Sequence, residues 1–197
     1  MQKAILKTRS MRQIILQIIL QTSRYLLITA AVSFLGWLYE VLLVRIKYGH
    51  WSNRGFLWLP FCPIYGITLT FTYFLIGTPK EKRGILKRVA NPYWHTALYL
   101  LFAFLIPTAA ELLVGGVMET SFHITLWSYK GMAMNFRGYI ALPISLLWMA
   151  LIYMFMRFFF SPLQKSIEKI PPKITVVAAS ALLISTVIDA TLQFMKM

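Results

Sequence analysis

The sequence predicts an all-α fold, a polytopic membrane helical bundle of about five transmembrane helices. Of the 197 residues, 58% are hydrophobic and only 13% are charged, whereas a soluble domain carries roughly a quarter charged residues. The apolar residues come in blocks of about 20, the length that crosses a hydrocarbon core of roughly 30 Å as a helix. This composition excludes a disordered tail, an acidic solvating protein and nearly every ordinary soluble enzyme.

The chain begins with a basic segment, residues 1–24, which we separate from a single transmembrane domain at 25–197. Residues 11–20 (MRQIILQIIL) are apolar apart from Arg12, Gln13 and Gln17. Such a stretch is typical of an amphipathic helix lying in the membrane interface. A sixth span is the less favoured alternative, because its glutamines would sit in lipid.

Five spans follow, each long enough to satisfy its own backbone hydrogen bonds in lipid as a helix. Pro60 and Pro63 predict that the second span begins as broken or extended backbone. Asn91-Pro92 predicts an N-cap and first helical residue for the third span, and Pro171-Pro172 precedes the fifth. The spans are expected at about 25–44, 56–76, 94–118, 139–160 and 174–195.

The basic residues are distributed unevenly between the two ends of these spans. Thirteen fall in the N-terminal segment and in the loops after the second and fourth spans, against six on the opposite side. The positive-inside rule then places the N-terminus in the cytoplasm and the C-terminus outside. The net charge of +14 therefore requires no nucleic acid. The cluster 80–88 additionally suits anionic lipid or a cytoplasmic partner.

Two stretches of the chain resemble each other. Residues 54–60 (RGFLWLP) match 137–143 (RGYIALP), and a Gly-x-x-x-Glu pattern at 36–40 matches one at 115–119. Both stretches follow a span that starts on the cytoplasmic side, so the repeat is parallel, about an axis along the membrane normal. We infer two repeated hairpins plus a fifth helix, the hairpins lying at about 25–77 and 94–160.

Acidic side chains within the spans mark the candidate site, because a carboxylate at membrane depth is costly unless it is paired or solvated. These acids continue stripes of Ser, Thr and Gly at helical spacing on three spans. The stripes predict a polar cleft that opens outward. The candidate substrate-binding residues are the four acids and the polar residues of the repeat: Glu40, Arg54, Glu111, Glu119, Asn135, Arg137 and Asp189.

A purely structural role predicts the same placement, with Glu40 and Glu119 pairing with Arg54 and Arg137 to fix the hairpins together. In that arrangement Glu111 and Asp189 are left freer for a substrate or a proton.

The remaining motifs indicate neither a metal, a cofactor nor an enzyme. Glu119 and His123 have helical i, i+4 spacing, but no further ligands complete a metal site. Cys62 is the only cysteine, which excludes an internal disulfide, and a lone buried cysteine is usually inert packing. The chain has no P-loop, so it cannot hydrolyse ATP by that route.

The chain resembles the bacterial family of putative ABC-transporter type IV proteins, also called putative ABC transporter permeases, over roughly residues 34–142. The resemblance is carried by 34–40 (FLGWLYE), 53–57 (NRGFL) and 62–66 (CPIYG), followed by Glu111, Gly115, Glu119, Trp127, Tyr129, Asn135 and Gly138. One departure lies at 127–130, which reads WSYK where the family typically has Trp-Asp-Tyr-Ser. The loop acid is replaced there, so a role for that acid does not carry over.

We therefore expect a permease-like or accessory subunit of a transport system in the bacterial cytoplasmic membrane. The resemblance implies an ATPase subunit docked on the basic cytoplasmic loops, and five spans suggest a homo-oligomer. Two alternatives stay open: a membrane-embedded enzyme acting on a lipid or cell-envelope precursor, and a non-catalytic membrane scaffold. Acids converging on a shared pocket would favour the enzyme, whereas a dry and fully paired interior would favour the scaffold.

Overall fold

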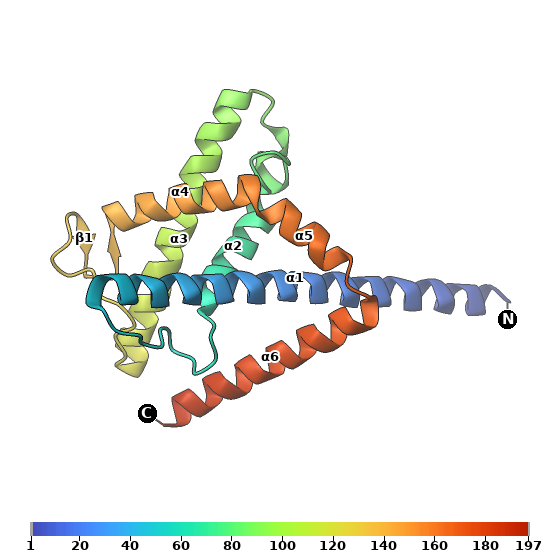
Figure 1. Ribbon diagram of the computed structural model, residues 1–197. Helices are drawn as coiled ribbons and strands as arrows, with labels where there is room; N and C mark the ends of the chain where they lie inside the picture. The colour runs from blue at the N-terminus through green and yellow to red at the C-terminus, as the bar shows by residue number, and fades with distance from the viewer. Residues whose placement is uncertain (1, 197) are drawn as a thin grey trace.

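The computed structural model describes the backbone of residues 2–196 and the side chains of residues 11–196. Helices dominate it, with one two-stranded antiparallel ribbon between them (Figure 1), so the all-α class is confirmed. The elements in chain order are α1 (Gln2–Tyr48), α2 (Pro63–Ile76), the 3-10 helix η1 (Gly84–Arg88), α3 (Pro92–Phe122), β1 (Asn135–Phe136), β2 (Ile140–Ala141), α4 (Leu142–Phe158), α5 (Phe160–Glu168) and α6 (Pro172–Met195).

Helix α1 is much longer than a membrane is thick. Its 47 residues span about 70 Å at about 1.5 Å per residue, more than twice the hydrocarbon core. Figure 1 shows its N-terminal part extending beyond the other helices. The helix continues without a break through residue 24, so the backbone does not mark the boundary expected there, and the division of the chain at that residue stays a prediction.

Three helices are long and apolar enough to cross a membrane: α1, α3 and α6. Helices α4 and α5 pass the same test only as a pair, bent by 47° at the break between them. Helix α2 has 14 residues, about 21 Å, which is too short to cross alone. The structure thus supports three or four spans among the described residues, and five spans stay a prediction.

The expected break at the start of the second span and the expected start of the third span are both confirmed. Helix α2 begins at Pro63 rather than at the expected residue 56, and residues 55–60 before it are bends rather than helix, as the two prolines predict. The Asn91 side chain accepts hydrogen bonds from the backbone N–H groups of Tyr93 and Trp94 at the start of α3. Local sequence therefore sets both starts.

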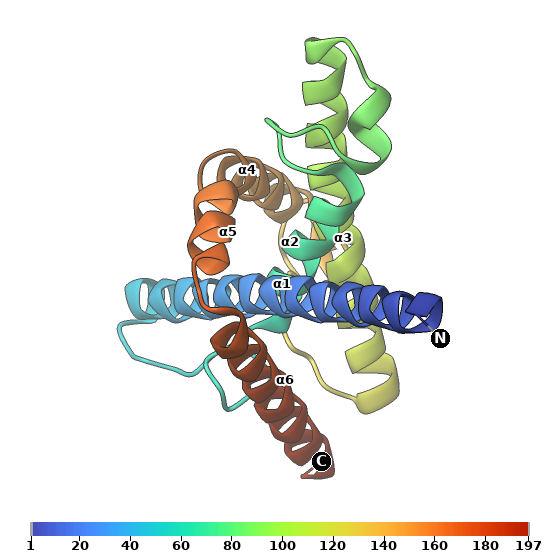
Figure 2. The same cartoon turned by 90° about the vertical axis from the view of Figure 1, so that its right-hand side faces the viewer.

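The helices do not lie parallel to one another. Helix α1 packs against α2 and α6, and α3 packs against α4, yet α1 runs steeply across α3 in both Figure 1 and Figure 2. The core lies where α1 to α5 meet. Its largest fully buried side chains are Ile28, Tyr73, Ile76, Tyr99, Met156 and Phe160.

The polar stripe of α1 faces α2. Thr29 Oγ1 lies 2.8 Å from Thr70 Oγ1 across the interface. A Cβ on Gly66 would overlap the Thr29 carbonyl oxygen and the Ser33 hydroxyl, so glycine is what allows the two backbones to approach. Thr29 and Ser33 therefore serve helix packing rather than an open cleft.

The two copies of the sequence repeat have the same backbone conformation at one matched position and different conformations around it. Gly55 and Gly138, which occupy the same place in 54–60 and 137–143, both have positive φ angles, of 91° and 78°. However, residues 54–60 are irregular, whereas the second copy passes through the β1–β2 ribbon. The internal repeat therefore stays a prediction.

Candidate functional site

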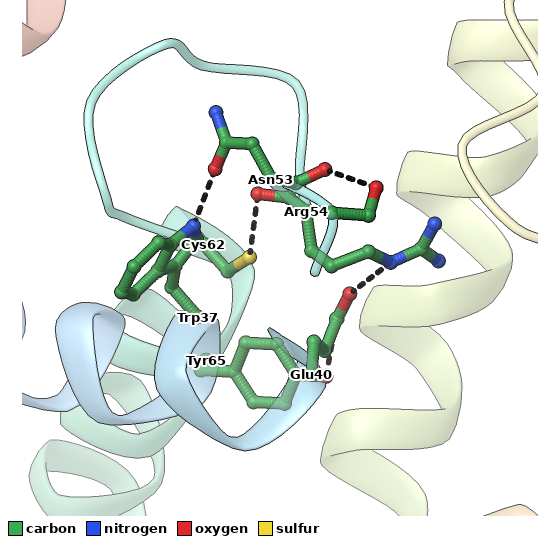
Figure 3. Close-up of polar contacts among 7 residues, drawn as sticks. Trp37, Glu40, Asn53, Arg54, Cys62 and Tyr65 are labelled. Atoms are coloured by element: carbon green, nitrogen blue, oxygen red, sulfur yellow. Dashed lines mark hydrogen bonds and ion pairs between the residues drawn. The ribbon is translucent and has the colours of Figure 1, made fainter. Parts of the chain in front are cut away.

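Glu40, near the end of α1, receives one partner from α2 and one from the α1–α2 segment (residues 49–62). The Tyr65 hydroxyl donates a 2.6 Å hydrogen bond to Glu40 Oε1. The Arg54 guanidinium lies 3.6 Å from Glu40 Oε2, the one ion pair found among residues 11–196. Figure 3 shows the Glu40 carboxylate between these two side chains. The expected pairing of Glu40 with Arg54 is present.

The α1–α2 segment is tied to α1 by Asn53. The Trp37 indole N–H donates a 2.6 Å hydrogen bond to Asn53 Oδ1, and the Asn53 amide donates to the Trp58 carbonyl at 3.3 Å (Figure 3 shows the first). Cys62, buried at the start of α2, has its thiol 3.9 Å from the Arg54 carbonyl oxygen. These contacts fix the backbone that carries Arg54.

Asp189 of α6 holds the same segment from the other side. Its carboxylate oxygens accept hydrogen bonds from the backbone N–H groups of Trp58, at 3.3 Å, and Leu59, at 2.8 Å. Asp189 is buried, with 6% of its surface exposed. The carboxylate thus satisfies two amides that irregular backbone leaves unpaired, which is a reason for its burial in an apolar helix.

Glu111 is the most enclosed acid of α3. It is 6% exposed. Its Oε1 accepts a 2.8 Å hydrogen bond from the Tyr129 hydroxyl and a 2.9 Å hydrogen bond from the Trp148 indole N–H. Its Oε2 is buried and has no hydrogen-bond partner among residues 11–196. A buried polar atom without a partner is rare in proteins and requires an explanation, such as backbone strain, a catalytic role or a bound water or ion.

Trp148 of α4 connects the two carboxylates through its ring. The ring packs edge-to-face against Tyr65 at 5.1 Å and against Tyr39 at 6.1 Å between centroids. Its N–H reaches Glu111 while Tyr65 reaches Glu40. Side chains of α1, α2, α3 and α4 thereby form one network that runs from Arg54 to Tyr129.

Tyr129 lies in the α3–α4 loop (residues 123–141), which two further hydrogen bonds hold in place. The Tyr129 N–H donates to the Gly138 carbonyl at 2.8 Å, and the Trp127 indole donates to the Tyr139 carbonyl at 2.9 Å. Burial, and next the charge of Glu111, raise the pKa of the Tyr129 phenol well above its usual value. The phenol therefore stays protonated and acts as a donor.

The other candidates lie outside this network. Glu119 is half-buried, and Asn135 and Arg137 are exposed in the α3–α4 loop. The guanidinium of Arg137 lies 5.7 Å from the Phe136 ring centroid, and Asn135 donates to the Met132 carbonyl at 2.8 Å. The expected pairing of Glu119 with Arg137 is absent from the side chains that the structure describes.

Glu119 and His123 do not share a helical face. Helix α3 ends at Phe122, and His123 takes a left-handed conformation with φ of 57° as its C-cap. The i, i+4 spacing seen in the sequence is therefore interrupted by the helix end. No three His, Cys, Asp or Glu side chains gather as metal ligands within the described part of the chain.

Three side chains that complete the network were not among the sequence candidates: Tyr65, Tyr129 and Trp148. In the sequence, Trp148 looks like an interfacial anchor, as most of the tryptophans do. Tyr65 follows Pro63-Ile64, and Tyr129 follows Trp127-Ser128. Neither pair of neighbours indicates that the tyrosine binds a carboxylate. Their partners lie 25 and 18 residues away along the chain, so only the tertiary fold brings them together.

A family model described as "Putative ABC-transporter type IV" matches residues 27–194. Neither the curated proteins nor the solved structures compared with the chain include a match. The matched range covers the whole network and also Trp37, Asn53 and Asp189, which hold the α1–α2 segment.

Proposed function

The chain belongs to the putative ABC-transporter type IV family, and on that premise we propose that it is the membrane-embedded subunit of a transport system. The family description and three apolar helices of membrane-spanning length support a transport-related membrane protein. We place its substrate contact at Glu111, with Glu40 and Arg54 as the neighbouring charged pair.

The unpartnered oxygen of Glu111 carries this proposal. A carboxylate oxygen buried in an apolar interior without a donor costs several kcal/mol. Glu111 Oε2 is in that position while Oε1 already has two donors. A substrate that brings an N–H donor or a positive charge to Oε2 removes the cost, so the site favours an amine or another small organic cation.

The rings around Glu111 support the same class of substrate. Trp148 contacts the Glu111 carboxylate through its N–H, and Tyr39 and Tyr65 pack against the Trp148 ring. Aromatic rings attract cations when water is excluded, so we propose that a cation at Glu111 is also stabilised by this aromatic group. An anionic substrate would meet repulsion from Glu111 instead.

Access to Glu111 requires movement, because the acid is closed from solvent. The α3–α4 loop supplies Tyr129 and is held by the two hydrogen bonds at Trp127 and Gly138. We propose that this loop covers the site and that Glu119, Asn135 and Arg137 form its exposed entrance. Asp189 contributes by holding the segment that carries Arg54.

The family description of an ABC transporter, together with the lack of a P-loop in this sequence, favours an energy source in a partner. We propose an ATPase subunit docked on the basic loops, with the N-terminus cytoplasmic and the C-terminus outside the bacterial cytoplasmic membrane. Helix α1 crosses α3 steeply (Figures 1 and 2), so the helices of a single chain do not surround a path across the membrane. We therefore propose that the transport unit is a homo-oligomer.

The two alternatives have less support. The contacts of Glu40 and Glu111 have no atom in common, so they do not resemble an acid–base pair around one reacting group. A pure scaffold would pair all its buried carboxylate oxygens, and Glu111 Oε2 is unpaired among the described residues.

The test uses the purified full chain and methylammonium and tetramethylammonium as probes. Trp148 donates its N–H to Glu111, so cation binding should change tryptophan fluorescence in a saturable way. Glu111→Gln should abolish the saturable change, and Glu168→Gln, which neutralises an exposed acid at the end of α5 outside the network, should retain it. Equal binding by wild type and Glu111→Gln, or no binding by either, would remove Glu111 from the substrate site. Copurification of an ATPase from native membranes tests the partner.

A further inference from the structure

The α2–α3 loop (residues 77–91) carries five basic residues and one acid, Glu81. Three of the five are used within the fold. Arg83 donates to the Tyr73 hydroxyl at 2.7 Å, Lys82 donates to the Val89 and Ala90 carbonyls at 2.8 and 3.1 Å, and the Lys80 ammonium lies 5.7 Å from the Phe158 ring centroid. These contacts, with the buried Leu86 of η1, fix the loop against the helices.

The other two basic residues, Lys87 and Arg88, end η1 and are exposed. Neither makes a hydrogen bond or an ion pair with a residue that the structure describes. Both line a surface hollow of about 510 Å³ together with Phe74, Leu75, Gly84 and Ile85. The hollow thus combines two unused positive charges with an apolar wall.

An apolar stripe leads away from this hollow along α2. Ile67, Phe71 and Phe74 are 60%, 55% and 47% exposed, and their spacing of four and three residues places them on one helical face. The stripe covers about 10 Å of helix at about 1.5 Å per residue. A ligand that fits both features has an anionic head for Lys87 and Arg88 and an apolar chain for the stripe.

We propose that this hollow binds the phosphate headgroup of an anionic phospholipid, with an acyl chain along Ile67, Phe71 and Phe74. The position suits a lipid, because the hollow lies where the apolar α2 meets a basic loop, and the exposed Tyr93 and Trp94 at the start of α3 are typical of the membrane–water interface. Charge complementarity selects an anionic headgroup over a zwitterionic one. A soluble phosphate compound would leave the stripe unexplained.

The test is native mass spectrometry of the full chain in detergent, with phosphatidylglycerol and phosphatidylcholine supplied in equal amounts. Each interfacial basic residue favours anionic lipid by about fivefold, so wild type should prefer phosphatidylglycerol by about tenfold or more. The double variant Lys87→Gln/Arg88→Gln should lose this preference. The matched control Lys165→Gln/Lys169→Gln, which removes the same charge near α5, should keep it.

Two further arms make the assignment specific. Phe71→Ser should reduce the binding of both lipids without changing their ratio, because it shortens the apolar stripe. Addition of sn-glycerol 3-phosphate should not displace the bound lipid. An unchanged preference in the double variant, an equal loss in the control, or displacement by sn-glycerol 3-phosphate would each overturn the proposal.

Discussion

Asp189→Ala is expected to destabilise the protein through the α1–α2 segment. Asp189 accepts the backbone N–H groups of Trp58 and Leu59, at 3.3 and 2.8 Å, and is 6% exposed. A hydrogen bond to a charged group contributes about 1.5–3 kcal/mol, and the longer of these two less. Removal of both should lower the free energy of unfolding by about 2–4 kcal/mol. Asp189→Asn, which keeps one oxygen, should lose about half of that.

The assay is reversible unfolding of the detergent-solubilised full chain, combined with hydrogen exchange of the peptide that contains residues 56–61. Exchange should speed up there in Asp189→Ala, because the two amides lose their acceptor. Thr191→Val is the matched control on α6, since the Thr191 hydroxyl donates only to the Val187 carbonyl of its own helix. A loss below about 0.5 kcal/mol with unchanged exchange at 56–61 would refute this account of Asp189.

Three further predictions concern packing and charge. Gly66→Val should cost at least about 1–3 kcal/mol by forcing α1 and α2 apart. Gly116→Ala, whose added Cβ meets nothing closer than 4.0 Å, should not destabilise in the same unfolding assay and should stabilise by up to about 1 kcal/mol. Arg54→Gln should lower the free energy of unfolding by less than about 1 kcal/mol, since the Arg54 and Glu40 side chains are 40% and 26% exposed. A larger decrease, measured in the same unfolding assay, would contradict this weak ion pair. The Tyr129 pKa is raised in the fold, so its contribution to stability should be constant below about pH 10, the unfolded value, and decline above it. Unfolding measured from pH 8 to 11 should show a steeper decline for wild type than for Tyr129→Phe, and parallel curves would count against the buried phenol.

The sequence predicts what depends on neighbouring residues. Pro60 and Pro63 disfavour a regular helix before them, and Asn91 can cap only the helix that follows it, so the break before α2 and the start of α3 were predictable. The Arg54–Glu40 pair was predictable too, because an acid within a span needs a partner and the repeat places an arginine in the next segment.

The other contacts of the site and the other helix ends depend on the tertiary fold, which the spacing of residues along the chain does not reveal. Trp148 is 37 residues from Glu111, and a tryptophan within an apolar block is equally compatible with an interfacial anchor and with a buried donor. Glu119 and His123 have helical spacing, yet the helix ends between them at Phe122. The short α2 was hidden for a similar reason, because residues 56–62 are apolar enough to extend the expected span although they are not helical.

The difference between the two hairpins bears on how transport would work. In the first, Arg54 neutralises Glu40, so that acid is fixed by an opposite charge. In the second, Arg137 is exposed and Glu119 has no ion-pair partner among residues 11–196, while Glu111 is held only by the neutral donors Tyr129 and Trp148. Neutral donors orient a carboxylate without cancelling its charge, so under the proposed function a cation would be attracted to Glu111. If the hairpins are repeats, their acids differ: the acid of the first is paired with an arginine, and the second keeps Glu111 without an opposite charge. A path with two equivalent binding sites is therefore disfavoured, and neutralising Glu111 should matter far more to ligand binding than neutralising Glu40.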